Sequence, residues 1–393
     1  MKSQQELKKL ILNAVTRNGQ MTRPELIALL EIRPASVIAA VDTLLQAGIL
    51  IEPERGGRKT GRHAPVLRFN PDHGWIAGID FQYRKTLGVI CDMTGEIRVQ
   101  VELAAGARPS PEAAKSEIRS VLERLREEAG RDWGKVRGVC LSDPGLVDLS
   151  TGVSLKAVNV PVWENVSSRA WLEQICSMPA LVLPKTMALT YMEYLTRHLD
   201  AAAGMLLLNT GYGIGAGFVK NDELFIGNSG RGMEIGHLVL VPQGPPCRCG
   251  NRGCLEALAG EAGIRRRVEE MLHNEVETAL RKAPFSLEYF IQCASCDRAA
   301  GIIANEICEY LAQGLTVAAT LLNPSHIVIA GELAALGRPL VETIAKALRL
   351  NCVLGTAEHL QLDLSSLGTA DTVRGAVLYL RRQLLEQEVF LGR

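Results

Sequence analysis

The chain has 393 residues, more than a single hydrophobic core usually supports, so two or three domains are expected. Hydrophobic residues make up 47% of the sequence and charged residues 22%, proportions that exclude a disordered or fibrous chain. The formal net charge is zero, but residues 1–70 hold eleven Lys/Arg against six Asp/Glu. This local excess of positive charge fits an anionic partner, and it fits a solvated basic face equally well.

Neither a secretory signal nor a membrane span is evident in the sequence. Residues 1–12 lack the uninterrupted apolar core of a signal peptide, and no later run of roughly eighteen apolar residues is free of polar breaks. We therefore expect a cytoplasmic protein with no membrane association. Ten cysteines could suggest disulfides, but three of them lie within residues 247–254, a spacing that suits metal thiolates in a reducing compartment.

Three short helices are predicted at the N-terminus. Apolar residues recur at helical spacing from Leu7 to Val15 and predict the first. The second begins at a capping box made by Thr22 and Glu25, and the third carries an apolar face and ends at Gly48. Strands are predicted at 49–52 and 66–69, on either side of a basic, glycine-rich loop.

This order of helices, strands and basic loop is typical of a winged helix-turn-helix, so residues 1–70 are predicted to bind DNA. In such a module the third helix enters the major groove and cations of the wing contact phosphate. The DNA-contacting residues predicted from this are Arg33, Ser36, Arg58, Lys59 and Arg62. The expected outer face of the third helix is poor in residues that read base edges, and consists of Ala35, Ser36, Ala39, Ala40 and Thr43. The alternative is a small protein-interaction module.

The remainder of the chain has the pattern of an α/β fold. Strands are expected at 76–80, 86–92 and 97–103, followed by a helix at about 111–128 and a further strand at 136–141. Glycines punctuate a strand pair within residues 206–219, where a tight turn or a close backbone approach to a ligand is expected. Residues 321–331 read as another apolar strand that ends in glycine, and residues 373–385 as a long amphipathic helix.

A group of metal-binding residue types lies in the C-terminal half. Cys247, Cys249 and Cys254 follow His237 at an interval that lets a loop fold back. Three thiolates and one imidazole complete a tetrahedral site with no open position, which is the ligand set of structural zinc. Zinc there would fix the neighbouring Glu256. The alternative is a set of buried free thiols.

At these residues the chain resembles the ROK family of repressors, open reading frames and kinases, and is most similar to its repressor branch, typified by xylose and N-acetylglucosamine repressors. Four family motifs carry the resemblance. They are CxCGxxGCxE at Cys247, Cys249, Gly250, Gly253, Cys254 and Glu256; ExGH at Glu234, Gly236 and His237; PGxVD at Pro144, Gly145, Val147 and Asp148; and NxPxW at Asn159, Pro161 and Trp163.

The resemblance implies an actin-like sugar-kinase fold of two lobes behind the winged helix-turn-helix. The first lobe is expected at 75–195 and the second, with the zinc motif, at 196–393, with the C-terminal helix returning to the first lobe. Family kinases hold hexose and nucleotide between the lobes. The sugar-binding residues carried over on the motifs are Asn159, Glu234, His237 and Glu256.

Two family elements that handle ATP are altered. Thr186 stands where the resemblance places the catalytic aspartate, and loss of such a base typically forfeits about 10²–10⁴ in rate. The glycine-rich phosphate loop DxGGT is replaced by residues 80–84, with bulky side chains. We therefore expect no enzyme activity; the alternative is an ATP-dependent sugar kinase with an N-terminal regulatory domain.

The functional hypothesis is a transcriptional regulator, a repressor of carbohydrate metabolism. It would bind operator DNA as a homodimer or homotetramer and respond to a sugar or sugar derivative through a switch near Pro71 to Gly74. Lys185 and Thr186 replace two family sugar contacts. The pocket is therefore expected to bind a sugar, another polyol, or a phosphosugar attracted by Lys185. Alternatively it binds none of these, and a protein partner regulates the body.

Overall fold

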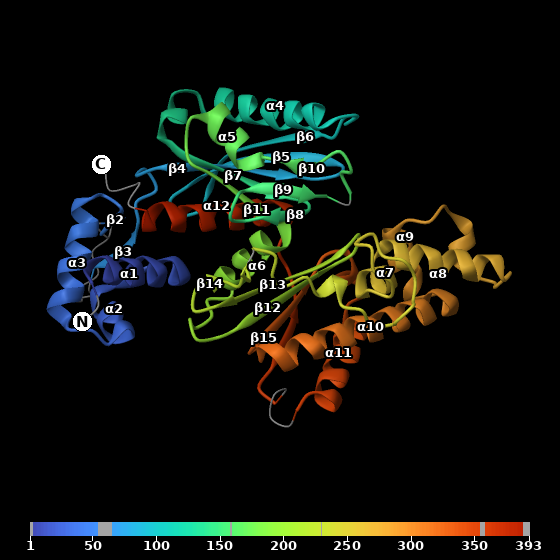
Figure 1. The fold of residues 1–393 in the computed structure, drawn as a ribbon. Coiled ribbons are helices and arrows are strands. Elements are labelled where there is room, and N and C mark those ends of the chain that lie inside the picture. The colour runs from blue at the N-terminus through green and yellow to red at the C-terminus, as the bar shows by residue number, and fades with distance from the viewer. Residues whose placement is uncertain (1–2, 54–64, 158, 229, 354–357, 388–393) are drawn as a thin grey trace. The chain divides into compact units, whose positions relative to one another are not determined.

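A computed structural model describes residues 3–53, 65–157, 159–228, 230–353 and 358–387 (Figure 1). The chain divides into two compact units. Unit 1 comprises Met1–Leu199 together with Gly368–Arg393, and unit 2 comprises Asp200–Leu367. Among the described residues, no helix has the length and apolar character needed to cross a membrane.

The N-terminal part of unit 1, the head, has the arrangement of a winged helix-turn-helix. Its elements are α1 (Gln4–Asn18), β1 (Met21–Thr22), α2 (Arg23–Leu30), α3 (Pro34–Gln46), β2 (Leu50–Ile51) and β3 (Val66–Phe69). The strands form an antiparallel sheet in the order β1-β3-β2. The predicted capping box is confirmed, because the Thr22 side chain accepts from the Glu25 backbone and Glu25 accepts from the Thr22 backbone. The basic loop between β2 and β3 lies outside the described residues.

One residue assigned to the outer face of α3 was placed wrongly. Ala40 is fully buried, since it lies on the same side of the helix as Val37 and Val41. Ala35, Ala39 and Thr43 are exposed, as expected. The error arose because a small residue carries little signal about which face of a helix it occupies.

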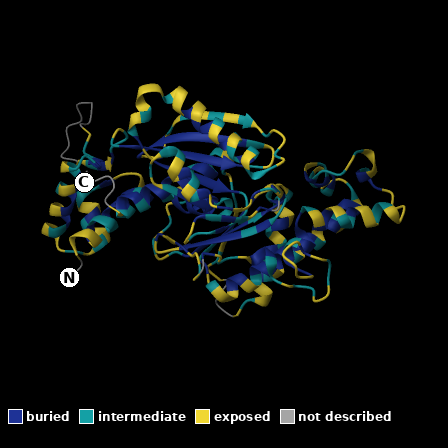
Figure 2. Ribbon diagram, turned by 45° about the horizontal axis from the view of Figure 1, so that its top comes forward, coloured by how far each residue is buried: buried dark blue, intermediate teal, exposed yellow. Residues whose placement is uncertain are grey.

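The body of unit 1 is built on a five-stranded sheet in the order β11-β7-β4-β5-β6. Its strands are β4 (Trp75–Phe81), β5 (Lys85–Asp92), β6 (Ile97–Ala104), β7 (Val136–Asp143) and β11 (Ala180–Pro184). β4, β5 and β6 pair antiparallel, whereas β4, β7 and β11 pair parallel. The central strands are buried on both faces, which explains their almost continuous apolar sequences (Figure 2).

Helices cover both faces of this sheet (Figure 1). They are α4 (Pro111–Ala129), the short 3₁₀ helix η1 (Gly130–Lys135) and α5 (Ser168–Cys176), and, on the other face, α6 (Lys185–Thr196) and α12 (Thr369–Glu386). A smaller antiparallel sheet packs beside them, in the order β10-β9-β8, from β8 (Leu146–Asp148), β9 (Val153–Lys156) and β10 (Glu164–Val166). The C-terminal helix α12 thus completes the core of unit 1.

The packing of α12 depends on glycine. A Cβ atom added at Gly375 would lie 2.0 Å from the carbonyl oxygen of Ala188, so α12 and α6 approach each other backbone to backbone. Gly78 of β4 makes room in the same way for Val373 and Val377 of α12. An edge-on contact between Tyr191 and Tyr379, with ring centroids 5.2 Å apart, adds to the same interface.

Unit 2 repeats the sheet topology of unit 1. Its strands are β12 (Met205–Thr210), β13 (Ile214–Lys220), β14 (Glu223–Leu224), β15 (His326–Ala330) and β16 (Gln361–Leu364). Counted along the chain within each unit, both sheets have the order third, second, first, fourth, fifth, with the first three strands antiparallel and the rest parallel. This duplicated order agrees with the two-lobed fold expected from the sequence.

The helices of unit 2 enclose one large apolar core. They are η2 (Ile235–His237), α7 (Leu255–Ala259), α8 (Glu261–His273), η3 (Ala279–Lys282), α9 (Leu287–Ala294), α10 (Arg298–Leu322), η4 (Glu332–Leu336) and α11 (Arg338–Asn351). The strand predicted from residue 321 starts only at His326, because Leu321 and Leu322 are the last residues of α10. A continuous apolar run does not reveal where a helix ends and a strand begins.

Replacing Gly375 with alanine should lower the free energy of unfolding by roughly 1–3 kcal/mol, because the new methyl group meets a backbone carbonyl that cannot rotate away. Urea unfolding followed by circular dichroism measures the change. Gly106→Ala is the matched control, since no atom lies within 4 Å of its added Cβ. Equal stability of the two variants would contradict the close approach of α12 and α6.

Candidate functional site

His237, Cys247, Cys249 and Cys254 of unit 2 bring their ligand atoms together. One such atom from each residue lies within 4.8 Å of all the others. The sulfur of Cys249 is 3.6 Å from that of Cys254, and the sulfur of Cys247 is 3.7 Å from Nδ1 of His237. A tetrahedron with metal–sulfur distances of about 2.3 Å has edges of about 3.8 Å. The four residues can therefore hold a metal ion, and the cysteines are free thiols.

The loop that carries the cysteines is shaped by its own backbone. Cys247 N–H donates to the carbonyl of Asn251, and Gly250 N–H donates to the carbonyl of Cys247, which forms a tight turn around the first two cysteines. Gly253 has a φ of +71°, and a Cβ there would lie 1.6 Å from the carbonyl oxygen of Val241. Only glycine fits this position, so the glycines of the motif set the directions of the cysteines.

The thiols differ in how readily they ionise without a metal. Burial raises the pKa of Cys254 to about 12, and hydrogen bonds donated to the neighbouring cysteines act in the same direction. Burial also opposes ionisation of Cys249, but hydrogen bonds from the Asn251 backbone and from the other two thiols outweigh it and lower the pKa. Binding of a metal cation therefore releases protons, and its affinity rises with pH.

Two acidic residues of the sugar-kinase motifs lie next to this cluster. Glu234 Oε2 is 3.9 Å from Nε2 of His237, the ring nitrogen that faces away from Cys247. Partial removal from water raises the pKa of Glu234; His237 lowers it and Glu256 raises it further. The Oε2 atom of Glu256 accepts the backbone N–H of Ile214 at 3.0 Å, and so holds the glycine-rich turn between β12 and β13. The structure brings Glu234, His237 and Glu256 into one region.

The residues at the two altered family elements all belong to unit 1. In unit 1, Gln82 donates its side-chain amide to the buried carboxylate of Asp80, and Thr186 lies in the first turn of α6. Burial raises the pKa of Asp80, while Lys185 lowers it. Tyr83, one of the bulky residues that replace the glycines of the family's phosphate loop, is 65% exposed. Asn159, the remaining predicted sugar contact, also belongs to unit 1.

Glu332 was not among the predicted site residues. A Cβ built on Gly211 would lie 1.8 Å from Oε2 of Glu332, so this carboxylate rests directly over the glycine-rich turn of unit 2. Gly211 has a φ of +151°, a conformation that side chains rarely adopt. The sequence did carry a signal for this position, since a glutamate and not a further glycine follows Gly331.

The predicted DNA contacts are only partly described. Arg33 is the exposed residue just before α3, and Ser36 lies half-buried in its first turn, with its N–H donating to the Arg33 carbonyl. Arg58, Lys59 and Arg62 lie outside the described residues. The start of α3 is therefore the described part of the predicted DNA surface.

A duplicated five-stranded topology together with a Cys₃His cluster defines a protein of the sugar-kinase-like class with a metal-binding loop. The sequence pattern of the ROK family matches residues 76–383, and the chain belongs to that family. The matched region begins after the head and includes the cluster.

Particular relatives refine this assignment. The chain is 23% identical over 375 residues to the xylose repressor of Caldicellulosiruptor bescii, covering 94% of each chain. It is 26% identical over 316 residues to a glucokinase of Halalkalibacterium halodurans, covering 79% of this chain and 96% of the enzyme. Among solved structures, a ROK family transcriptional regulator, a homologue of the Escherichia coli MLC protein, has the same fold with a TM-score of 0.81, 22% identity and 98% coverage of each chain.

Substitution of Cys254 with serine should abolish tight metal binding, because a hydroxyl at this position cannot act as the soft anionic ligand. Inductively coupled plasma mass spectrometry should find about one metal ion per wild-type chain and almost none in the variant. Cys296→Ser is the control, since this exposed cysteine lies outside the cluster and should leave the metal content unchanged. A metal-free wild-type protein after purification without chelators would contradict the assignment.

Proposed function

We propose that the protein is a DNA-binding transcriptional regulator, a repressor of carbohydrate metabolism whose kinase-like body senses a sugar without phosphorylating it. The observation that carries the proposal is the extent of the similarity. The match to the xylose repressor takes in 94% of this chain, whereas the match to the glucokinase takes in 79% of it and nearly all of the enzyme. The additional length corresponds to a winged helix-turn-helix, a fold whose third helix and wing suit DNA.

The absence of kinase activity is supported by three local changes. Thr186 offers no carboxylate to take the proton of a sugar hydroxyl, and Gln82 replaces a glycine of the family's phosphate loop and donates to Asp80. Glu332 places a carboxylate over Gly211, in the turn where backbone N–H groups would meet a nucleotide. A unit negative charge 4 Å from another costs about 1 kcal/mol in water and about 4 kcal/mol near a protein surface. ATP is therefore repelled where a kinase would bind it.

A sugar remains the best-supported effector. Glu234, His237 and Glu256 match the family's sugar-binding motifs and lie together, and carboxylates accept hydrogen bonds from the hydroxyl groups of a sugar. Lys185 adds a cation at the start of α6, where an anionic group such as a sugar phosphate would also gain from the helix dipole. Asn159 of unit 1 is also carried over from the family's motifs as a proposed sugar contact.

Zinc is the proposed metal, because three thiolates and one imidazole form a closed tetrahedral set. In this role zinc would hold the loop of residues 247–254 and orient His237, whose second ring nitrogen faces Glu234. We further propose a homodimer or homotetramer, since two symmetry-related heads match the two half-sites of a palindromic operator.

Alanine at Arg33 should weaken operator binding by about 1–3 kcal/mol, because this exposed guanidinium precedes the helix expected in the major groove. Alanine at Arg58 and Arg62 together should weaken binding to all sequences and reduce the slope of log affinity against log salt by about one per residue. Fluorescence anisotropy with duplexes from the promoter of its own gene measures both. Arg338→Ala, an exposed arginine of unit 2, is the control and should change neither quantity.

A monosaccharide panel separates a sensor from an enzyme. We expect D-xylose, D-glucose or N-acetyl-D-glucosamine, or one of their 6- or 5-phosphates, to raise the thermal midpoint, and none of them to yield ADP when ATP is present. Glu256→Gln should reduce the sugar's effect while the protein remains folded. ADP formation by the wild type would favour the regulated kinase, and no stabilisation by any sugar would favour regulation through a protein partner.

A further inference from the structure

The chain passes between the two units twice, and an element next to each crossing contacts the head. It leaves unit 1 after Leu199, just beyond the end of α6, and returns at Gly368, just before α12. His198 lies one residue before the first crossing, and α12 starts one residue after the second. Both make hydrogen bonds to consecutive residues of α1, Thr16 and Arg17.

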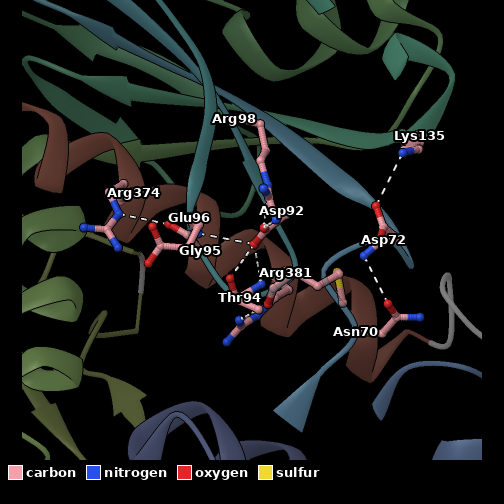
Figure 3. Close-up of polar contacts among 11 residues, drawn as sticks. Asn70, Asp72, Asp92, Thr94, Gly95, Glu96, Arg98, Lys135, Arg374 and Arg381 are labelled. Carbon is pink, nitrogen blue, oxygen red and sulfur yellow. Dashed lines mark hydrogen bonds and ion pairs between the residues drawn. The ribbon is translucent and has the colours of Figure 1, made fainter. Parts of the chain in front are cut away.

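Arg381 makes the contact from α12. Its Nη1 donates to the carbonyl of Met93 at 2.5 Å, and its Nη2 donates to Oγ1 of Thr16 at 2.8 Å. The guanidinium carbon lies 4.3 Å from the centre of the Phe69 ring of β3. One side chain therefore joins the body, the first helix of the head and the last strand of the head. Figure 3 shows Arg381 beside Asp92 and Thr94 of the body.

The first crossing contributes a second bond to the same turn of α1. Nδ1 of His198 lies 2.5 Å from the carbonyl oxygen of Arg17, and since a carbonyl only accepts, the imidazole donates. α6 and α12 also pack against each other through Gly375 and Ala188. The helices α6 and α12 thus pack together and both contact α1.

Hydrogen bonds and an ion pair also hold the linker between head and body. Asn70 donates its side-chain amide to the carbonyl of Gly48, and its Oδ1 accepts from the Asp72 backbone. The Asp72 carboxylate is 3.4 Å from the ammonium of Lys135 in the body (Figure 3). The exposed fractions of these last two side chains are 74% and 38%, so their ion pair adds little energy. The hydrogen bonds of Arg381 and His198 to α1 are partly buried and contribute more to the attachment of the head.

The buried charge of Arg381 reduces the free-energy difference between the attached and the released state of the head. The side chain is 2% exposed, and among the described residues its Nε has no hydrogen-bond partner and its bonds go to neutral acceptors. Burial lowers the pKa of Arg381 to about 10, with opposing contributions from Tyr191 and Asp92, so it stays charged at neutral pH. A buried cation without a bonded carboxylate is costly. Separation of head and body would return it to water, which brings the attached and released states closer in free energy.

We propose that Arg381 and His198 are the positioning residues through which the body sets the orientation of the DNA-binding head. His198 lies beside one of the two chain crossings between the units, and Arg381 lies in the helix that follows the other. Both side chains bond to the last turn of α1. This inference rests on the proposed function, since it supposes a head that binds DNA and a body that responds to a ligand.

Hydrogen–deuterium exchange of the full-length protein tests the positioning role. Thr16→Val, His198→Leu and Arg381→Met should each accelerate exchange in the last turn of α1 and in β3 by about tenfold, the loss expected for one hydrogen bond to a charged or well-aligned group. Exchange in β4 and β7 should not change. Arg374→Met is the matched control, because this arginine of α12 donates to the Gly95 carbonyl of the body and makes no hydrogen bond to the head.

Should Arg381→Met fail to fold, Thr16→Val and His198→Leu decide the question without removing a charge. Unchanged exchange in α1 in both of these variants, or equal acceleration by Arg374→Met, would overturn the proposal.

A second experiment tests whether the signal travels by this route. D-Xylose, D-glucose and N-acetyl-D-glucosamine are added, and exchange is followed in unit 2 and in α1. A sugar that slows exchange in unit 2 should alter exchange in α1 of the wild type and of Arg374→Met, but not of the Thr16→Val/His198→Leu double variant. An equal response of α1 in the double variant would refute the route. If none of the sugars changes unit 2, sugar sensing fails, and the first experiment still decides the positioning role.

Discussion

The backbone contact between α6 and α12 is the constraint on which unit 1 depends. Gly375 lets the two helices touch, and α12 can then lie flat on the sheet over Gly78. The interior of unit 1 is therefore completed by residues from opposite ends of the sequence. The same helix pair contacts the head, so the packing that closes the body also helps to determine where the head rests.

Local signals in the sequence were reliable guides to the structure. The capping box of Thr22 and Glu25 and the glycines around Cys247 to Cys254 each act over a few residues, so their effect could be predicted without knowledge of the fold. The contacts of Arg381 with Thr16 and of Glu332 with Gly211 join residues far apart in sequence. An arginine within the apolar pattern of α12 was the one visible sign, and it did not identify the partner.

The proposed function separates sugar binding from catalysis. Glu234 and Glu256 stay beside the metal cluster, and Glu256 has a structural task as well, since it holds the turn at Ile214. Glu256 can therefore be retained for its contact with Ile214 as well as for ligand binding. The positions changed from the family's kinase motifs, Gln82 and Thr186, belong to unit 1 and have no such second task in the loop of residues 247–254.

The carboxylate of Glu332 over Gly211 has a consequence for physiology. A family kinase binds its sugar together with ATP, so its conformation reflects the energy supply of the cell as well as the sugar. Under the proposed function, a negative group in the phosphate turn disfavours nucleotide binding by about 1–4 kcal/mol. The regulatory output would then depend on the sugar more than on the adenylate pool.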